Sequence, residues 1–164
     1  MALQNLDISD TLISLGNFLK NDAAIQEFCE DHFDEPLKIY VGDFVRKTIP
    51  SSADCPYIVL TDFKKKEGQN IEFCEYRVVL LVGLTSDEAL IEVDDLLMLD
   101  VYDVGAKFMT LIEDVFNAKT KRNRPLSRCE TDGPYPLDVK HWVGKMDLTW
   151  RIYQTLGTTY QEEL

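Results

Sequence analysis

The residues that come closest to a catalytic pattern in this chain are Asp54, Asp62 and Lys64. Two carboxylates can hold Mg²⁺ while a lysine steadies the attacking water, which is the chemistry of a divalent-metal-dependent nuclease. The second aspartate and the lysine belong to an Asp-Phe-Lys triplet that runs directly into Lys65 and Lys66. Short triplets of this kind match many unrelated sequences by chance. A metal-dependent nuclease of phage or bacterial origin is therefore kept as an alternative hypothesis.

The two histidines, His32 and His141, are the other groups that could transfer protons near pH 7. Neither lies in a nucleophile-elbow motif, and the sequence has no glycine-rich phosphate-binding motif. The four cysteines are Cys29, Cys55, Cys74 and Cys129. Because none forms a C-x-x-C pair, reduced thiols packed as small apolar side chains are favoured over a zinc site. We therefore predict no catalytic, cofactor-binding or metal-binding residue, and no enzyme activity.

Charge is unevenly distributed along the chain. Acidic residues number 29 and basic residues 17, which gives a net charge of −12. A surface this negative repels phosphate backbones and disfavours a dedicated nucleic-acid-binding protein. One segment, residues 119–128, has the opposite sign: it contains Lys119, Lys121, Arg122, Arg124 and Arg128. An acidic body with one basic segment favours self-association through complementary patches, or one local anionic contact.

The length of 164 residues predicts a single domain, residues 1–164, with its core in 9–156 and a polar tail in 157–164. Apolar residues make up 45% of the chain, which is ordinary for a folded protein with one hydrophobic core. The opening residues lack the basic and apolar regions of a signal peptide, and no apolar run approaches the length of a membrane span. A cytosolic protein that does not enter a membrane is the expectation.

Two segments have the three- and four-residue apolar spacing of amphipathic helices. The first covers residues 9–32, with an N-cap at Ser9 or Asp10 and a break near Asn21. The second runs from Asp95 to Asn117. These segments predict an N-terminal helix and a central helix.

The remaining segments favour strands. Short apolar alternation predicts a strand over residues 37–41, and the β-branched and aromatic residues of 56–60 predict another. A turn over Lys64–Asn70 should join this second strand to the next one in a hairpin. The next strand, 71–84, is apolar on both faces over 78–82, which places it at the centre of a sheet or against another subunit. The last strand, 141–156, alternates between a dry face and a wet face.

Between the second helix and the last strand, residues 118–139 show little regular pattern and predict a long loop. Within it, Leu126–Glu130 is the part that could pair as an edge strand. The order of elements predicts an α+β fold, with a mostly antiparallel mixed sheet of about four to five strands and the N-terminal and central helices packed on one face.

This order of segments resembles the tail-terminator or tail-completion proteins of long-tailed bacteriophages and related minor tail proteins. The resemblance covers roughly residues 9–156. It begins with the amphipathic helix and the proline-led strand Pro56-Tyr57-Ile58-Val59-Leu60, which ends at Asp62. It continues with Tyr76-Arg77-Val78-Val79-Leu80-Leu81-Val82, the helix Tyr102–Phe108, and Trp142–Tyr153 as the strand that closes the sheet.

The resemblance implies a non-enzymatic virion subunit that assembles into a ring, often a hexamer. Such a ring caps the finished tail tube and meets the head connector, so the implied partners are the tail tube protein and the head–tail connector protein. The implied location is the virion tail, assembled in the host cytoplasm, with DNA passing through the lumen without specific binding. A stand-alone binding domain without a virion role is the third hypothesis. The residues expected to contact neighbouring subunits or partners are Val79, Leu81, Lys119, Lys121, Arg122, Arg124 and Arg128.

Overall fold

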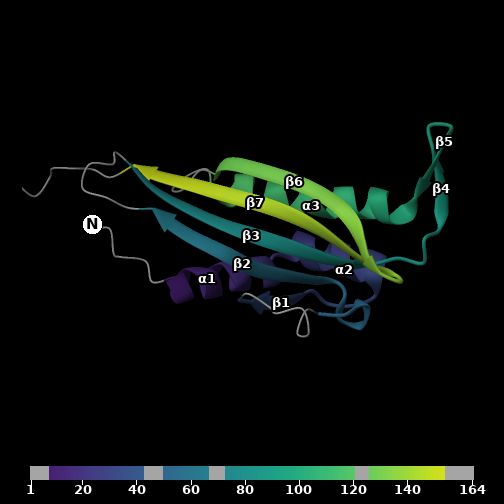
Figure 1. The fold of residues 1–164 in the computed structure, drawn as a ribbon, viewed down its shortest axis with the longest axis horizontal. Helices are drawn as coiled ribbons and strands as arrows, with labels where there is room; N and C mark the ends of the chain where they lie inside the picture. The colour runs from purple at the N-terminus through teal and green to yellow at the C-terminus, as the bar shows by residue number, and fades with distance from the viewer. Residues whose placement is uncertain (1–7, 43–49, 67–72, 121–125, 154–164) are drawn as a thin grey trace, which may run out of the picture.

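The computed structural model describes residues 8–42, 50–66, 73–120 and 126–153, and its elements follow one another as Figure 1 shows. The helices are α1 (Ile8–Lys20), α2 (Ala23–Phe33) and α3 (Asp100–Thr120), with a 3-10 turn η1 at Ser52–Asp54. The strands are β1 (Lys38–Val41), β2 (Tyr57–Lys66), β3 (Phe73–Thr85), β4 (Leu90–Val93), β5 (Leu96–Leu99), β6 (Leu126–Asp138) and β7 (His141–Tyr153). The predicted α+β class is confirmed.

The predicted break in the N-terminal helical region is confirmed, and Asp22 explains it. The Asp22 carboxylate accepts hydrogen bonds from the backbone N–H groups of Ala24 at 3.0 Å and Ile25 at 3.3 Å, which caps α2. A side chain that satisfies these N–H groups stabilises a new helix start. The predicted N-cap of α1 at Ser9 or Asp10 is wrong, because α1 already includes Ile8.

The main sheet has the strand order β1-β2-β3-β7-β6 (Figure 1). Only β1 and β2 are parallel, and the other neighbours are antiparallel. As predicted for the stretch 78–82, β3 is the central strand. The predicted hairpin of β2 and β3 is also confirmed, but Lys64, Lys65 and Lys66 belong to β2 rather than to the turn. Residues 67–72 lie outside the described part of the chain.

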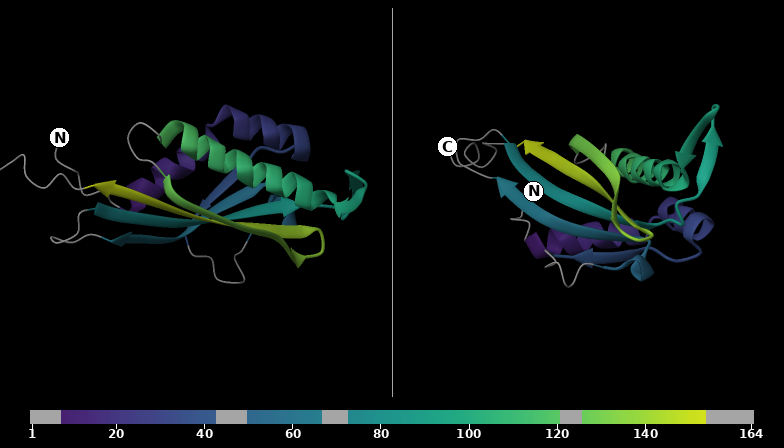
Figure 2. Two further views of the ribbon diagram at one scale, coloured as in Figure 1. Left: turned by 90° about the horizontal axis from the view of Figure 1, so that it is seen from above. Right: turned by 45° about the vertical axis from the view of Figure 1, so that its right-hand side comes forward.

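All three helices cover one face of the main sheet (Figure 2). Apolar side chains from the helices interleave with those that β2, β3 and β7 direct toward them, and this forms the main core. Its largest fully buried members include Leu19, Phe108, Phe116, Leu80 and Met146. The predicted packing of the helices on one face is therefore confirmed.

The opposite face of the sheet carries a second, smaller cluster. It consists of Cys55, Tyr57 and Val59, with Tyr40 and Leu81 packed against them. We call this face the open face because none of the three helices covers it (Figure 2). The side chains of Val79, Thr149 and His141 also point toward this face, and all three are buried. The last strand was predicted to expose this face to water, and that prediction is wrong for Thr149 and His141.

Strands occupy two segments that were predicted to be helix or loop. The central helix begins at Asp100, because residues 90–99 form the separate hairpin of β4 and β5. Residues 118–139 are not a long loop: α3 continues to Thr120, and Leu126–Asp138 form β6, which pairs with β7 along its length. Three register shifts interrupt this pairing, one of them at Gly133, whose φ of +90° favours glycine. As an edge strand with one bonded neighbour, β6 accommodates polar residues and prolines.

Candidate interaction surfaces

The candidate nuclease residues lie at two places along β2. Asp54 lies in η1, before β2 begins, and its carboxylate accepts hydrogen bonds from the Ser51 backbone at 2.8 Å and the Ser51 hydroxyl at 2.9 Å. Asp62 lies five residues beyond the first residue of β2, which corresponds to about 16 Å of strand. It contacts Lys64 at 3.2 Å and Arg77 at 3.4 Å. Asp62 and Lys64 are therefore neighbours, whereas Asp54 belongs to a separate hydrogen-bonded turn.

The two histidines are also separate from each other. His32 lies in α2, where its ring stacks on Phe28 with ring centroids 4.0 Å apart. His141 is buried and lies 2.8 Å from the hydroxyl group of Tyr57. Burial lowers the pKa of His141, and the carboxylates of Asp138 and Asp54 oppose this with a weaker effect. Within the described ranges, no group of three or more His, Cys, Asp or Glu side chains is arranged to hold a metal ion.

The residues expected to contact partners are distributed over several elements. Val79 is buried on the open face, and Leu81 is half-buried against the cluster of Cys55, Tyr57 and Val59, so much of their apolar surface is used inside the chain. Arg128 is exposed in β6 and forms an ion pair with Glu130. Lys119 lies in the last turn of α3, and Lys121, Arg122 and Arg124 lie outside the described residues. Their role as partner contacts stays a prediction.

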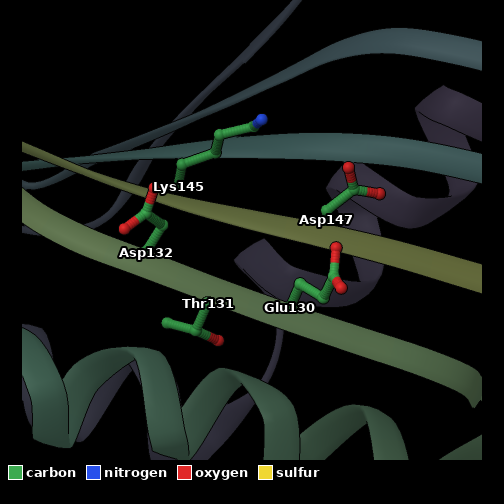
Figure 3. Close-up of a pocket in the computed structure, with 5 residues that line it drawn as sticks. All are labelled: Glu130, Thr131, Asp132, Lys145 and Asp147. Carbon is green, nitrogen blue, oxygen red and sulfur yellow. The ribbon is translucent and has the colours of Figure 1, made fainter.

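A polar cavity of about 400 Å³ lies over the paired strands β6 and β7. Its lining residues are Glu130, Thr131, Asp132, Lys145 and Asp147 (Figure 3). Asp147 is held by Arg77 of β3, whose Nε donates to Asp147 Oδ1 at 2.7 Å and whose Nη2 donates to Oδ2. This pairing lowers the pKa of Asp147 and raises that of Arg77. The cavity thus borders an ion-pair network in which Arg77 of β3 contacts both Asp62 of β2 and Asp147 of β7.

The most unusual feature of the surface is the hairpin of β4 and β5, which projects away from the body of the molecule (Figures 1 and 2). Asp94 and Asp95 connect its strands, and both have positive φ values, as the two-residue turn of a tight hairpin requires. Three of its leucines have exposed fractions of 64% or more: Leu90, Leu96 and Leu97. A two-stranded hairpin that buries so little apolar surface gains little stability of its own.

Hydrogen bonds nevertheless fix the base of the hairpin. The Ser86 hydroxyl donates to Asp100 Oδ1 at 2.6 Å and accepts from the Glu88 backbone N–H at 2.9 Å. The Asp100 backbone N–H donates to the carbonyl of Ala89 at 2.8 Å. Lys140, in the turn between β6 and β7, forms an ion pair with Asp87. The hairpin is therefore attached firmly at its base while its leucines remain uncovered.

Further exposed apolar side chains lie beside this hairpin, at the start of α3 and around the turn that joins β6 to β7. The described part of the chain exposes ten large apolar side chains. Eight of them lie in these three places. The eight are Leu90, Val93, Leu96, Leu97, Tyr102, Tyr135, Leu137 and Val139. We call this region the hairpin end. Scattered apolar residues are normal on a surface, but several exposed leucines on one projecting hairpin favour an interaction with another protein.

Neither a protein-family model nor a curated protein matches this sequence. Among the described residues, no helix combines the length and apolarity that crossing a bilayer requires. The hairpin end is the surface that the geometry favours as functional. The sequence contains a signal for the β4–β5 hairpin alone, which the helix prediction from Asp95 overlooked: a pair of aspartates between two apolar runs, Leu90-Ile91 and Leu96–Leu99.

Proposed function

We propose that this chain is a non-enzymatic structural subunit that forms a ring, caps the tail tube of a long-tailed phage and joins the tube to the head connector. The observation that carries the proposal is the hairpin end, where the chain presents uncovered leucines on a projecting hairpin with a fixed base. Leucines exposed in this way favour contact with another protein, because their burial removes apolar surface from water.

A projecting element at one end of a subunit also suits a ring. A contact between two different surfaces of identical subunits repeats from copy to copy, and it closes into a ring when the rotation per subunit permits. A contact between two identical surfaces would instead produce a dimer. The asymmetric shape of this molecule, with its hairpin at one end, supports the first arrangement (Figure 1).

The charge of the chain is compatible with a channel for DNA. With a net charge of −12, a ring of these subunits repels phosphate groups, which lets DNA pass without being retained. The acidic side chains of Glu130 and Asp132, both in β6, line the polar cavity and add negative charge to the surface of the sheet. In this proposal the partners are the tail tube protein and the connector protein, and the protein resides in the virion tail.

The decisive experiment is electron microscopy of tails assembled with and without this protein. We expect tails made with it to end in a ring of uniform diameter and to join heads, and tails made without it to vary in length or to remain unjoined. Native mass spectrometry of the ring should give a multiple near six. Tails that are uniform and join heads in the absence of the protein would refute the proposal.

The basic segment has its own test within this function. We expect Arg122→Glu combined with Arg124→Glu to weaken assembly or tail joining, because the reversal turns attraction for an acidic neighbour into repulsion. Unchanged assembly and joining would remove this segment from the mechanism while leaving the ring proposal in place.

A further inference from the structure

The strand β5 (Leu96–Leu99) has a backbone edge without the features that usually protect an edge strand. Its sequence is Leu-Leu-Met-Leu, which lacks the lysine, proline or bulge that discourages pairing with another chain. Within the described part of the chain, β5 pairs with β4 alone, on a hairpin that projects from the body of the molecule (Figure 1). The side chains of Leu96 and Leu97 are 70% and 74% exposed. We call this side of Leu96–Leu99 the β5 edge.

The hydrogen bonds of the hairpin show which backbone groups lie on the β5 edge. The Asp100 N–H donates to the carbonyl of Ala89, so these two residues form a hydrogen-bonded pair at the base. Hydrogen-bonded and non-hydrogen-bonded pairs alternate along antiparallel strands. In the register of β4 and β5, Leu97 therefore belongs to a pair that does not exchange hydrogen bonds. Its N–H and C=O groups point away from β4, in the direction from which a further strand could bond to them.

Negative charge lies at both ends of the β5 edge. Residues 87–100 contain six acids and no basic residue. Asp94 and Asp95 precede β5 at the tip of the hairpin, and Asp100 follows it at the base. The cation that contacts this region, Lys140, forms its ion pair with Asp87, before β4 begins. The edge thus presents four apolar residues between two acidic ends.

This distribution of charge disfavours a second copy of the chain on the β5 edge. In an antiparallel pair of two β5 strands, Asp94 and Asp95 of one copy would lie beside Asp100 of the other. In a parallel pair, each acid would lie beside its own counterpart. Like charges opposed in this way destabilise the pairing of strands. A strand with an apolar centre and basic ends would meet the same edge with attraction instead.

We propose that the β5 edge binds an extended segment of a different protein, a segment with apolar residues between two basic ends. The segment adds a third strand to the hairpin by hydrogen bonding to the backbone of Leu97. Its apolar side chains pack beside those of β5, and its basic residues meet the acids at the tip and the base. A neighbouring subunit of the proposed ring would contact other parts of the molecule, so the inference goes beyond the proposed function and does not depend on it.

Two synthetic peptides test the proposal by fluorescence anisotropy. Both contain the sequence Leu-Val-Leu-Val and a fluorescein label. One has a pair of lysines at each end, and the other has a pair of glutamates at each end. We expect the lysine peptide to bind this protein and the glutamate peptide to bind about tenfold more weakly or less. Equal binding of the two peptides would show that the acidic ends do not select the partner, and it would overturn the proposal.

A proline substitution on each edge of the hairpin locates the binding site. Leu97→Pro removes the outward N–H and keeps the hydrogen bonds to β4, because an edge strand tolerates proline where its N–H faces solvent. Leu90→Pro is the matched control, since Leu90 pairs with Leu99 without hydrogen bonds and its N–H points away from β5. We expect Leu97→Pro to weaken binding of the lysine peptide about tenfold. Leu90→Pro should bind this peptide as the wild type does, and circular dichroism confirms that both variants are folded.

A charge variant completes the test. Asp94→Asn with Asp95→Gly removes the acids of the tip while supplying Asn-Gly, a favoured pair for this type of turn. We expect this variant to bind the lysine peptide several times more weakly than the wild type does and to bind the glutamate peptide no more weakly. The proposal is overturned if the lysine peptide does not bind at millimolar concentration, or if Leu97→Pro binds it as well as the wild type. Electron microscopy of tails decides the proposed function separately, because it does not involve these peptides.

Discussion

The hydroxyl group of Tyr57 in β2 lies 2.8 Å from Nε2 of His141 in β7, and both residues are buried. The central strand β3 lies between these two strands, so the contact crosses it. The Tyr57 ring passes over Gly83, its partner in the register of β2 and β3. A Cβ atom on Gly83 would lie 2.0 Å from Cε1 of that ring. The contact between Tyr57 and His141 therefore requires glycine at position 83.

We expect Gly83→Ala to lower the free energy of unfolding by about 1 to 3 kcal/mol, the usual cost of overpacking a buried site. Urea denaturation followed by circular dichroism measures this change. In a Tyr57→Val background the same substitution should cost much less, because the ring that it would strike is gone. Equal costs in the two backgrounds would show that the Tyr57 ring does not set the requirement for glycine.

Stability should decline on mild acidification because of His141. Burial lowers the pKa of His141 in the folded chain below its ordinary value of 6.5, so the unfolded chain binds more protons between the two pKa values. Stability is then complete above the unfolded pKa and is lost as the pH falls below it. We expect the free energy of unfolding to decrease from pH 7.5 to pH 5.5, and His141→Gln to reduce this dependence. An identical pH profile in the variant would contradict the assignment.

The ion pair of Arg77 with Asp147 should stabilise the open face. The Asp147 side chain is only 15% exposed, so removing one partner leaves a poorly solvated charge. We expect Arg77→Met, which leaves the Asp147 carboxylate without this partner, to cost about 1 to 3 kcal/mol. The double variant Arg77→Met with Asp147→Leu should be closer to the wild type, as a double-mutant cycle by chemical denaturation would measure. Additive costs of the single changes would show that the pair is not coupled.

The base of the hairpin should depend on Ser86. The variant Ser86→Ala removes both the hydrogen bond to Asp100 and the acceptor of the Glu88 N–H, so we expect faster hydrogen exchange across residues 88–99 and a loss of about 1 kcal/mol. Ser127→Ala removes one hydrogen bond to the Thr149 carbonyl in a different part of the sheet and is the control. It should leave exchange in the hairpin unchanged. Similar exchange in both variants would contradict the proposed role of Ser86.

The elements with strong local signals could be predicted from the sequence. The apolar stretch at 78–82 indicated the central strand, because a strand with two neighbours buries side chains on both of its faces, as Leu80 and Val79 show. The break in the N-terminal helical region followed from Asn21-Asp22, since aspartate is a strong N-cap. In these cases the local pattern and the tertiary structure agree.

The parts that sequence reasoning missed depend on distant partners. The strand β6 has few apolar residues, and its position is set by pairing with β7, which local pattern does not encode. The strand β5 lies inside the segment predicted as the central helix, because a short continuous apolar run such as Leu96–Leu99 fits a strand and a buried helix equally well. The hairpin end could not be identified from sequence for the same reason, since its residues come from three separate segments that only the fold brings together.

The central position of β3 has a consequence for how the chain reaches its fold. One edge of β3 forms hydrogen bonds with β2, which is close in sequence. The other edge pairs with β7, which is synthesised only after β4, β5, α3 and β6. Until then the most apolar strand of the protein has an unsatisfied backbone edge, and such edges recruit other chains. Premature termination before His141 should therefore yield aggregates rather than a smaller native molecule.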